Sequence, residues 1–317
     1  MAGPATRNPP PSRADRGRSR EELRRRREAR RRQLRRRRLA LAGAVLGALA
    51  LVIVLIVALS GGGSSNERQR SSASASDARK QARTSTSAAY RRESRAITKV
   101  LAYTPFVSRG SPRKREVALT IDDGPGPLTP EFVRTLQQLH APATFFVVGQ
   151  QLNSFGRGLR DAVRAGFVIG DHTEQHQNLP SLSSGRQAKA VQDAALRIRS
   201  YGVPYPRLFR PPGGAFDAAT LRVLREHRML AVLWTVDTAD FTRPGARAIV
   251  QRAVDGARNG AIILMHDGGG DRRQTLTALP AIVHRLRARG YQLVTVPQML
   301  LHDPPSRRQA RPLSPGA

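Results

Sequence analysis

The sequence predicts an α/β fold for residues 115–300, a small and incomplete β/α barrel, with a doubly wound open sheet as the alternative. Two observations support this fold class. Short apolar runs alternate with longer amphipathic runs, which is typical of right-handed βαβ units that build a parallel sheet. Ionisable residues also gather directly after the apolar runs, where both folds place their functional loops.

The first segment, residues 1–38, is strongly basic and carries 16 arginines against four acidic residues. A segment of this composition cannot bury a core, so we expect it to be disordered. It suits either a nucleic-acid-binding arm or the cytoplasmic flank of a membrane span. The residues that follow favour the second interpretation.

Leu39 to Leu59 is a run of 21 residues without a charge. As a helix it would be about 31 Å long at 1.5 Å per residue, which matches a hydrocarbon core of about 30 Å. The apolar region of a cleaved signal peptide has only about 7–15 residues. We therefore predict an uncleaved transmembrane helix, with residues 1–38 in the cytoplasm and the rest of the chain outside. No nucleic-acid partner is then needed to explain the arginines.

We assign residues 60–114 to a flexible linker, because they begin with Gly61-Gly62-Gly63 and continue as a Ser/Ala/Thr/Arg-rich segment. One part of this linker, near residues 90–101, has a helical pattern. Its positive charge would suit anionic lipid or an anionic wall polymer, or would simply be solvated. We expect residues 301–317 to form a disordered tail.

The barrel itself is predicted to contain seven strands and six helices. The strands are expected at Val117–Ile121, Ala143–Val148, Phe167–Ile169, Leu208–Phe209, Leu230–Val236, Ala261–Met265 and Gln292–Val296. The helices are expected at Thr129–His140, Gly156–Ala165, Gly185–Tyr201, Asp217–Arg228, Ala246–Arg258 and Thr275–Arg289.

Five of the seven predicted strands end in ionisable or turn-forming residues, and this coincidence is the main indication of an active site. The ends are Asp122-Asp123, the segment Asp171 to His176, Arg210-Pro211-Pro212-Gly213-Gly214, the segment Asp237 to Phe241, and His266-Asp267. Because parallel strands share one carboxyl edge, we expect these groups to meet on one rim.

Three of these residues form a candidate metal site. His172 and His176 are four residues apart and would face the same way if their segment were a helical turn. With Asp123 they make a set of two imidazoles and one carboxylate, which suits zinc or a similar divalent ion. A chain without cysteine has no thiolate ligands to offer. Asp122 would then act as a general base toward a water activated by the metal.

A second group would supply an acid. His266 leaves the end of a predicted strand and titrates near neutral pH, so it is either a general acid or a hydrogen-bonded core histidine. Asp240 or Asp237 could orient it. Arg210, fixed by the prolines beside it, could pair with Asp122 and keep it ionised.

These motifs, in this order, resemble those of the polysaccharide deacetylases, the NodB-homology enzymes of carbohydrate esterase family four. The resemblance covers residues 115–300 and implies a distorted (β/α)7 barrel that removes acetyl groups from a glycan with a metal, usually zinc. By match, it makes Asp122 the catalytic base and His266 the catalytic acid. The other matched residues are Asp123, His172 and His176 as metal ligands, Arg210 and Asp240 as residues that tune the base and the acid, Gly213 in the oxyanion hole and Leu264 in the acetyl pocket.

The sequence departs from the family pattern at Phe241, where Trp is usual, and at Gly213, where an aromatic residue is common. Both changes affect the wall of the substrate groove, and every acid, base and ligand position is filled. We therefore expect a membrane-anchored enzyme that deacetylates a cell-envelope glycan, peptidoglycan first. The alternatives are a deacetylase of chitin or chitooligosaccharides, an acetyl-xylan esterase, and a non-enzymatic glycan-binding surface protein.

Overall fold

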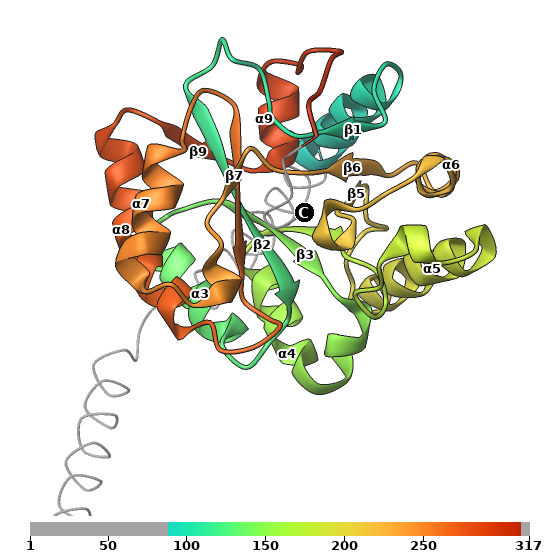
Figure 1. The fold of residues 1–317 in the computed structure, drawn as a ribbon, viewed down its shortest axis with the longest axis horizontal. Helices are drawn as coiled ribbons and strands as arrows, with labels where there is room; N and C mark the ends of the chain where they lie inside the picture. The colour runs from blue at the N-terminus through green and yellow to red at the C-terminus, as the bar shows by residue number, and fades with distance from the viewer. Residues whose placement is uncertain (1–87, 312–317) are drawn as a thin grey trace, which may run out of the picture. The chain divides into compact units, whose positions relative to one another are not determined.

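The computed structural model of the chain describes residues 88–311 (Figure 1). The predicted basic segment 1–38, the predicted span Leu39–Leu59, linker residues 60–87 and residues 312–317 lie outside this range. Within residues 88–311, no helix has the length and apolar character needed to cross a membrane.

A curved sheet of parallel strands forms the centre of the described domain. Its strand order is β1-β6-β5-β4-β3-β2-β8-β7, and β9 also pairs with β2. From β6 to β2 the order follows the chain in one direction without reversal, as in a barrel and unlike a doubly wound sheet. The strands are β1 (Phe106–Val107), β2 (Glu116–Gly124), β3 (Ala143–Val147), β4 (Val168–Asp171), β5 (Leu208–Phe209), β6 (Leu230–Val232), β7 (Val236–Asp237), β8 (Ala261–His266) and β9 (Gln292–Val294).

The sheet is interrupted where the sequence predicted a single strand, Leu230–Val236. In the structure this run is split: β6 pairs with β5, and β7 pairs with β8 on the far side of the sheet. The residues between them make the crossing, with Thr235 N donating to Ile262 O at 3.0 Å. A straight strand could not reach both neighbours, so the prediction of one unbroken strand is wrong. The result is a half-barrel rather than a regular closed one.

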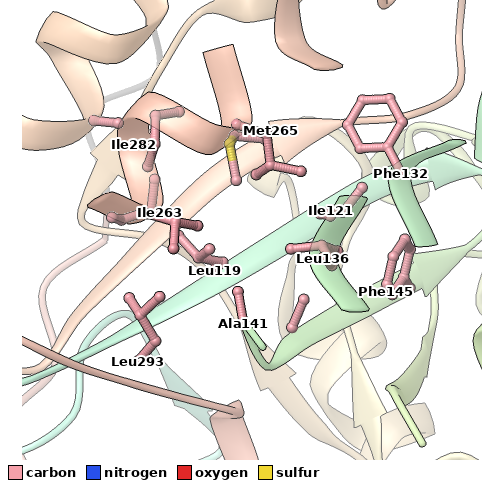
Figure 2. Packing of buried hydrophobic residues seen from close by; sticks show 14 of the residues in the cluster. Leu119, Ile121, Phe132, Leu136, Ala141, Phe145, Ile263, Met265, Ile282 and Leu293 are labelled. Carbon is pink, nitrogen blue, oxygen red and sulfur yellow. The ribbon is translucent and has the colours of Figure 1, made fainter. Parts of the chain in front are cut away.

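Alternation along β2 and β8 separates two cores. Leu119 and Ile121 of β2, with Ile263 and Met265 of β8, pack against the surrounding helices (Figure 2). Residues of the opposite parity face the barrel interior, where Ala118, Ile262 and Leu264 belong to a second cluster. Since Asp122 has the parity of Ala118, this alternation points its carboxylate inward.

Helices surround the sheet (Figure 1), and most follow the predicted positions with shifted ends. They are α3 (Thr129–Gln138), α4 (Leu152–Arg164), α5 (Ser184–Ser200), α6 (Ala218–Glu226), α7 (Ala246–Asp255), α8 (Arg273–Ala288) and α9 (Val296–His302). Short 3₁₀ turns lie between them: η1 (Gly149–Gln151), η2 (Leu179–Ser181), η3 (Pro212–Gly214) and η4 (Asp240–Thr242).

The predicted linker and tail boundaries need correction. Residues 88–101 form the helix that the pattern indicated, but its buried face, Ala96, Ile97 and Val100, packs into the interior cluster. The folded domain therefore starts before residue 115. At the other end, the described tail residues contact the same region, because Tyr103 Oη donates to Pro305 O at 3.0 Å and Gln309 Oε1 accepts from Ser108 N at 3.0 Å.

Candidate active site

Asp122 lies at the end of β2 as a buried carboxylate paired with a buried arginine. Arg210 Nη1 donates to Asp122 Oδ1 at 2.7 Å, and the side chains are 0% and 3% exposed. The rest of the guanidinium is held by Thr120 Oγ1 at 2.8 Å, Val232 O at 2.9 Å and Leu233 O at 3.1 Å. Burial lowers the pKa of Arg210, while Asp122 opposes that shift. The predicted pairing of Arg210 with the base is thus present, with its donors occupied by fixed acceptors.

Asp123 turns away from its neighbour because its backbone is left-handed, with φ of 70°. Its Oδ1 lies 3.4 Å from His172 Nε2 and 3.3 Å from His176 Nε2. Burial would raise the pKa of Asp123, but the facing imidazoles hold it well below its usual range. The structure therefore brings together the three predicted metal ligands, with one donor atom of each within 4.8 Å of the others.

The His172–His176 segment is a loop rather than the helical turn considered from the sequence. Two residues with positive φ, Thr173 at 67° and His176 at 55°, reverse the chain so that the second imidazole folds back toward the first. The two rings meet edge to face, with centroids 5.0 Å apart. The i, i+4 spacing therefore predicted that His172 and His176 lie together, but a loop and not a helical turn brings them together.

The three side chains fit a divalent metal by their own chemistry. The buried Asp123 Oδ1 has no hydrogen-bond partner among the described residues, and it faces two imidazole nitrogens. His172 Nδ1 lies 2.6 Å from Arg210 O; a carbonyl only accepts, so this nitrogen carries the proton and Nε2 keeps its lone pair for a metal. Two nitrogens and one carboxylate oxygen make a donor set that suits a divalent ion such as zinc.

His266 ends β8 directly beside Asp122, its register partner on β2. Its Nδ1 lies 2.7 Å from Asp240 Oδ1, and Asp240 Oδ2 accepts from His266 N at 2.9 Å and from Thr275 Oγ1 at 2.7 Å. Burial disfavours the imidazolium, but the Asp240 carboxylate raises the pKa of His266 to about 9. His266 is therefore protonated at neutral pH, as a general acid must be.

Of the two carboxylates considered as partners of His266, the structure selects Asp240. Asp237 Oδ1 instead accepts from Ala239 N at 2.7 Å, which shapes the turn after β7. Burial raises the pKa of Asp237, whereas hydrogen bonds and the charge of His266 lower that of Asp240 despite its burial. The carboxylate with the lower pKa is the one that can hold an imidazolium.

The two predicted substrate-contact residues lie on the same rim at different depths. Leu264 is buried on the interior face of β8, two residues before His266. Gly213 lies in η3 at φ of 60°, and a Cβ added there would meet nothing within 4 Å. The departure at Phe241 leaves an exposed ring, edge-on to His266 with centroids 5.8 Å apart.

Sequence reasoning missed several residues that hold this site together. Thr120 and Thr275 bond to Arg210 and Asp240, but a threonine on a strand or helix gives no signal of such a role. Asp267 was seen only as part of a strand-end motif. It is fully buried against Thr129, and burial first, then the charge of Asp123, raises its pKa to about 7.

The half-barrel fold places Asp122, His266 and a candidate metal site on one rim, an arrangement typical of a hydrolytic barrel enzyme. A family profile described as polysaccharide deacetylase matches residues 109–232. A peptidoglycan-N-acetylglucosamine deacetylase of Bacillus cereus is 35% identical over 208 residues, which cover 64% of this chain and 97% of that protein. The chain belongs to the polysaccharide deacetylase family and, like this relative, to the hydrolases that act on N-acetyl groups.

Two further comparisons agree with this assignment. A chitooligosaccharide deacetylase of a Bradyrhizobium species is 34% identical over 199 residues, 58% of this chain and 90% of that protein. A crystal structure of a peptidoglycan N-acetylglucosamine deacetylase superposes with a TM-score of 0.61 at 29% identity, covering 66% of this chain and 97% of the other. The relatives thus include enzymes named for two different glycans.

Proposed function

We propose that this protein is a zinc-dependent N-deacetylase of a cell-envelope glycan, with peptidoglycan amino sugars as its substrate. One observation carries the proposal: Asp122 and His266 are register partners on adjacent strands, one bound to a buried arginine and the other to a buried aspartate. A base and an acid are thereby held on the same rim as the Asp123, His172 and His176 cluster.

The roles follow from the contacts that Asp122 and His266 make. Asp122, paired with Arg210, is the general base that removes a proton from the attacking water. His266, kept protonated by Asp240, is the general acid that delivers a proton to the leaving amine. Asp123, His172 and His176 would hold the metal, which when bound polarises the acetyl carbonyl and lowers the pKa of a water.

The pocket residues complete the assignment. The backbone N–H of Gly213 would stabilise the oxyanion, and Leu264 would contact the acetyl methyl group. The exposed Phe241 ring would pack against the sugar at the mouth of the site. The roles of Gly213 and Leu264 are those that the family resemblance implies, and the role of Phe241 rests on its exposed position beside His266.

Peptidoglycan is favoured over chitooligosaccharide and acetylated xylan by the 35% identity to a peptidoglycan deacetylase across 97% of its length. The chitooligosaccharide deacetylase, nearly as similar at 34%, makes that substrate the second candidate. A non-enzymatic glycan-binding role would predict the loss of an acid, base or ligand, and each is present at its position.

Acetate release by the full chain with added zinc tests the proposal on three substrates: peptidoglycan, chitin oligomers and acetyl-xylan. We expect release from peptidoglycan, a drop in release with a chelator, and recovery with zinc. Release from chitin oligomers alone would replace the substrate. No release from any of the three would reject the catalytic proposal.

We further propose that the protein is anchored by Leu39–Leu59, with the barrel on the outer face of the cytoplasmic membrane. The support is the uncharged 21-residue run behind an arginine-rich segment, which matches a bilayer span and its cytoplasmic flank. An envelope glycan would then lie within reach of the domain.

A further inference from the structure

We propose that Glu174, which lies between the two metal-binding histidines, is a positioning residue that sets the affinity and geometry of the metal site through an ion pair with Arg197 of α5. This inference rests on the proposed metal site and adds to it a residue that never touches the metal.

Glu174 is a residue at which the His172–His176 loop is fastened to the domain, next to Thr173, whose O accepts from Gly149 N at 3.0 Å. Arg197 grips its carboxylate with two nitrogens, Nη2 to Oε1 at 2.8 Å and Nε to Oε2 at 3.2 Å. The Glu174 side chain is only 12% exposed. A two-point arginine–carboxylate pair of this kind fixes direction as well as distance.

The backbone of the same residue is also bonded on both sides. Glu174 N donates to Ala190 O of α5 at 2.9 Å, and Glu174 O accepts from Gln150 N of η1 at 2.8 Å. Arg197 reaches further, to Asn153 Oδ1 of α4 at 2.9 Å. Two helices and the turn after β3 therefore converge on this one loop residue.

The two histidines differ in what holds them. His172 is buried and bonded to Arg210 O, so its ring is fixed independently of the loop. The His176 side chain is 48% exposed, and within the described domain it contacts Asp123 and the His172 ring. The position of His176 thus depends on the backbone of its loop, which Glu174 fastens two residues earlier.

The absence of a side chain at Gly149 leaves space for the Glu174 carboxylate. A Cβ at Gly149 would lie 2.1 Å from Glu174 Oε2 and 3.1 Å from the Ala194 backbone of α5. Its φ is not in the left-handed region, so the turn does not require glycine for its conformation. The space is needed for the carboxylate.

The test measures zinc affinity of the full chain, stripped of metal, by competition with a chelator. Glu174→Gln and Arg197→Gln should each weaken zinc binding about 10–100-fold, the usual cost of losing an outer partner of a ligand. Because both act through one ion pair, the double variant should be no weaker than the worse single variant. Asp193→Asn, which breaks the exposed Lys189 pair on the same helix, is the matched control and should bind as the wild type.

Cobalt substitution distinguishes a change in the geometry of the metal site from a general loss of protein stability. The visible spectrum of the cobalt form should change in Glu174→Gln and Arg197→Gln and stay unchanged in Asp193→Asn, while the thermal midpoints of the metal-free proteins remain similar. If Glu174→Gln does not fold, Arg197→Gln carries the same test from the more exposed partner.

The possible failures are distinguishable. Wild-type zinc affinity and an unchanged cobalt spectrum in both single variants would overturn the role of Glu174 and leave the metal site intact. A wild-type chain that binds no zinc would overturn this inference together with the proposed metal dependence.

Discussion

At the residue scale, the protonation states of Asp240 and His266 are set by the hydrogen bond between them. Burial alone would raise the pKa of Asp240 and lower that of His266, but their hydrogen bond reverses both shifts. Asp267, fully buried near Asp123, lacks such a cation and its pKa rises to about 7. Partner identity, more than burial, therefore decides which acids of this rim are ionised.

The two adjacent carboxylates of β2 should fail differently when changed. Asp122→Asn keeps the shape and a hydrogen bond but removes the base, so we expect zinc affinity to remain and turnover to fall about 10²–10⁴-fold. Asp123→Asn should weaken zinc binding first and be partly rescued by excess zinc. Activity as a function of free zinc measures both. Rescue of Asp122→Asn by zinc would reverse the two roles.

The His266–Asp240 pair predicts the alkaline limb of the pH profile. Since the pKa of His266 is raised to about 9, the acid should stay protonated up to that pH and kcat/KM should fall above it. In Asp240→Asn the largest contribution that opposes burial is lost and only the charges of Asp122 and Asp123 remain, so the limb should move down by about one pH unit. Thr277→Ala, on the exposed side of α8, is the control. An unmoved limb would assign the acid to another group.

The same pair makes a stability prediction with a definite sign. The folded-state pKa of His266 lies above its ordinary value of 6.5. The contribution of the His266–Asp240 pair to the free energy of unfolding is therefore fully present below pH 6.5 and is lost as the pH rises through about 9. Urea unfolding across this window should show a decline in the free energy of unfolding that is smaller in Asp240→Asn.

At the element scale, the helix over residues 88–101 belongs to the core rather than to a tether. Ile97, 3% exposed, packs among residues of the barrel interior. Ile97→Ala should lower the free energy of unfolding by about 2–5 kcal/mol, the usual range for a buried large-to-small change. Lys99→Ala, on the exposed face of the same helix, should change it little. Urea unfolding of both variants measures this difference. Equal free energies of unfolding for Ile97→Ala and Lys99→Ala would mean that the helix does not unfold cooperatively with the barrel.

The elements that the sequence predicted well are those with a strong local pattern. Continuous apolar runs predicted β2, β3 and β8, and strand-end motifs contained eight of the nine candidate site residues. Leu264, which lies within β8, was named only through the family resemblance. The split of β6 from β7 could not be seen, because both halves of Leu230–Val236 are equally apolar. The Glu174–Arg197 pair is 23 residues apart in the chain, and nothing in either residue's neighbourhood links them. Only tertiary structure brings such partners together.

At the scale of the whole molecule, the proposed anchor predicts a fixed orientation. Protease added to intact cells should remove the barrel and spare residues 1–38, because only the part beyond Leu59 would be outside. A cytoplasmic protein of the same cells serves as the control for lysis. Recovery of a soluble form that starts near Gly61 would show cleavage and reject the anchor. Protection of the barrel would reverse the orientation.

The split between β6 and β7 has a consequence for Arg210. Its Nε and Nη2 donate to Val232 O and Leu233 O at that split, and its Nη1 donates to Asp122. The side chain that pairs with the proposed base is therefore also hydrogen-bonded to the backbone where the barrel wall is split. Lysine has a single side-chain nitrogen, so it cannot bond to the backbone carbonyls at the split and to Asp122 with the same geometry. Arg210→Lys would remove hydrogen bonds to the backbone at the split and weaken the pairing with Asp122 at the same time. The structure of the barrel wall and the environment of the base can therefore only change together at this position.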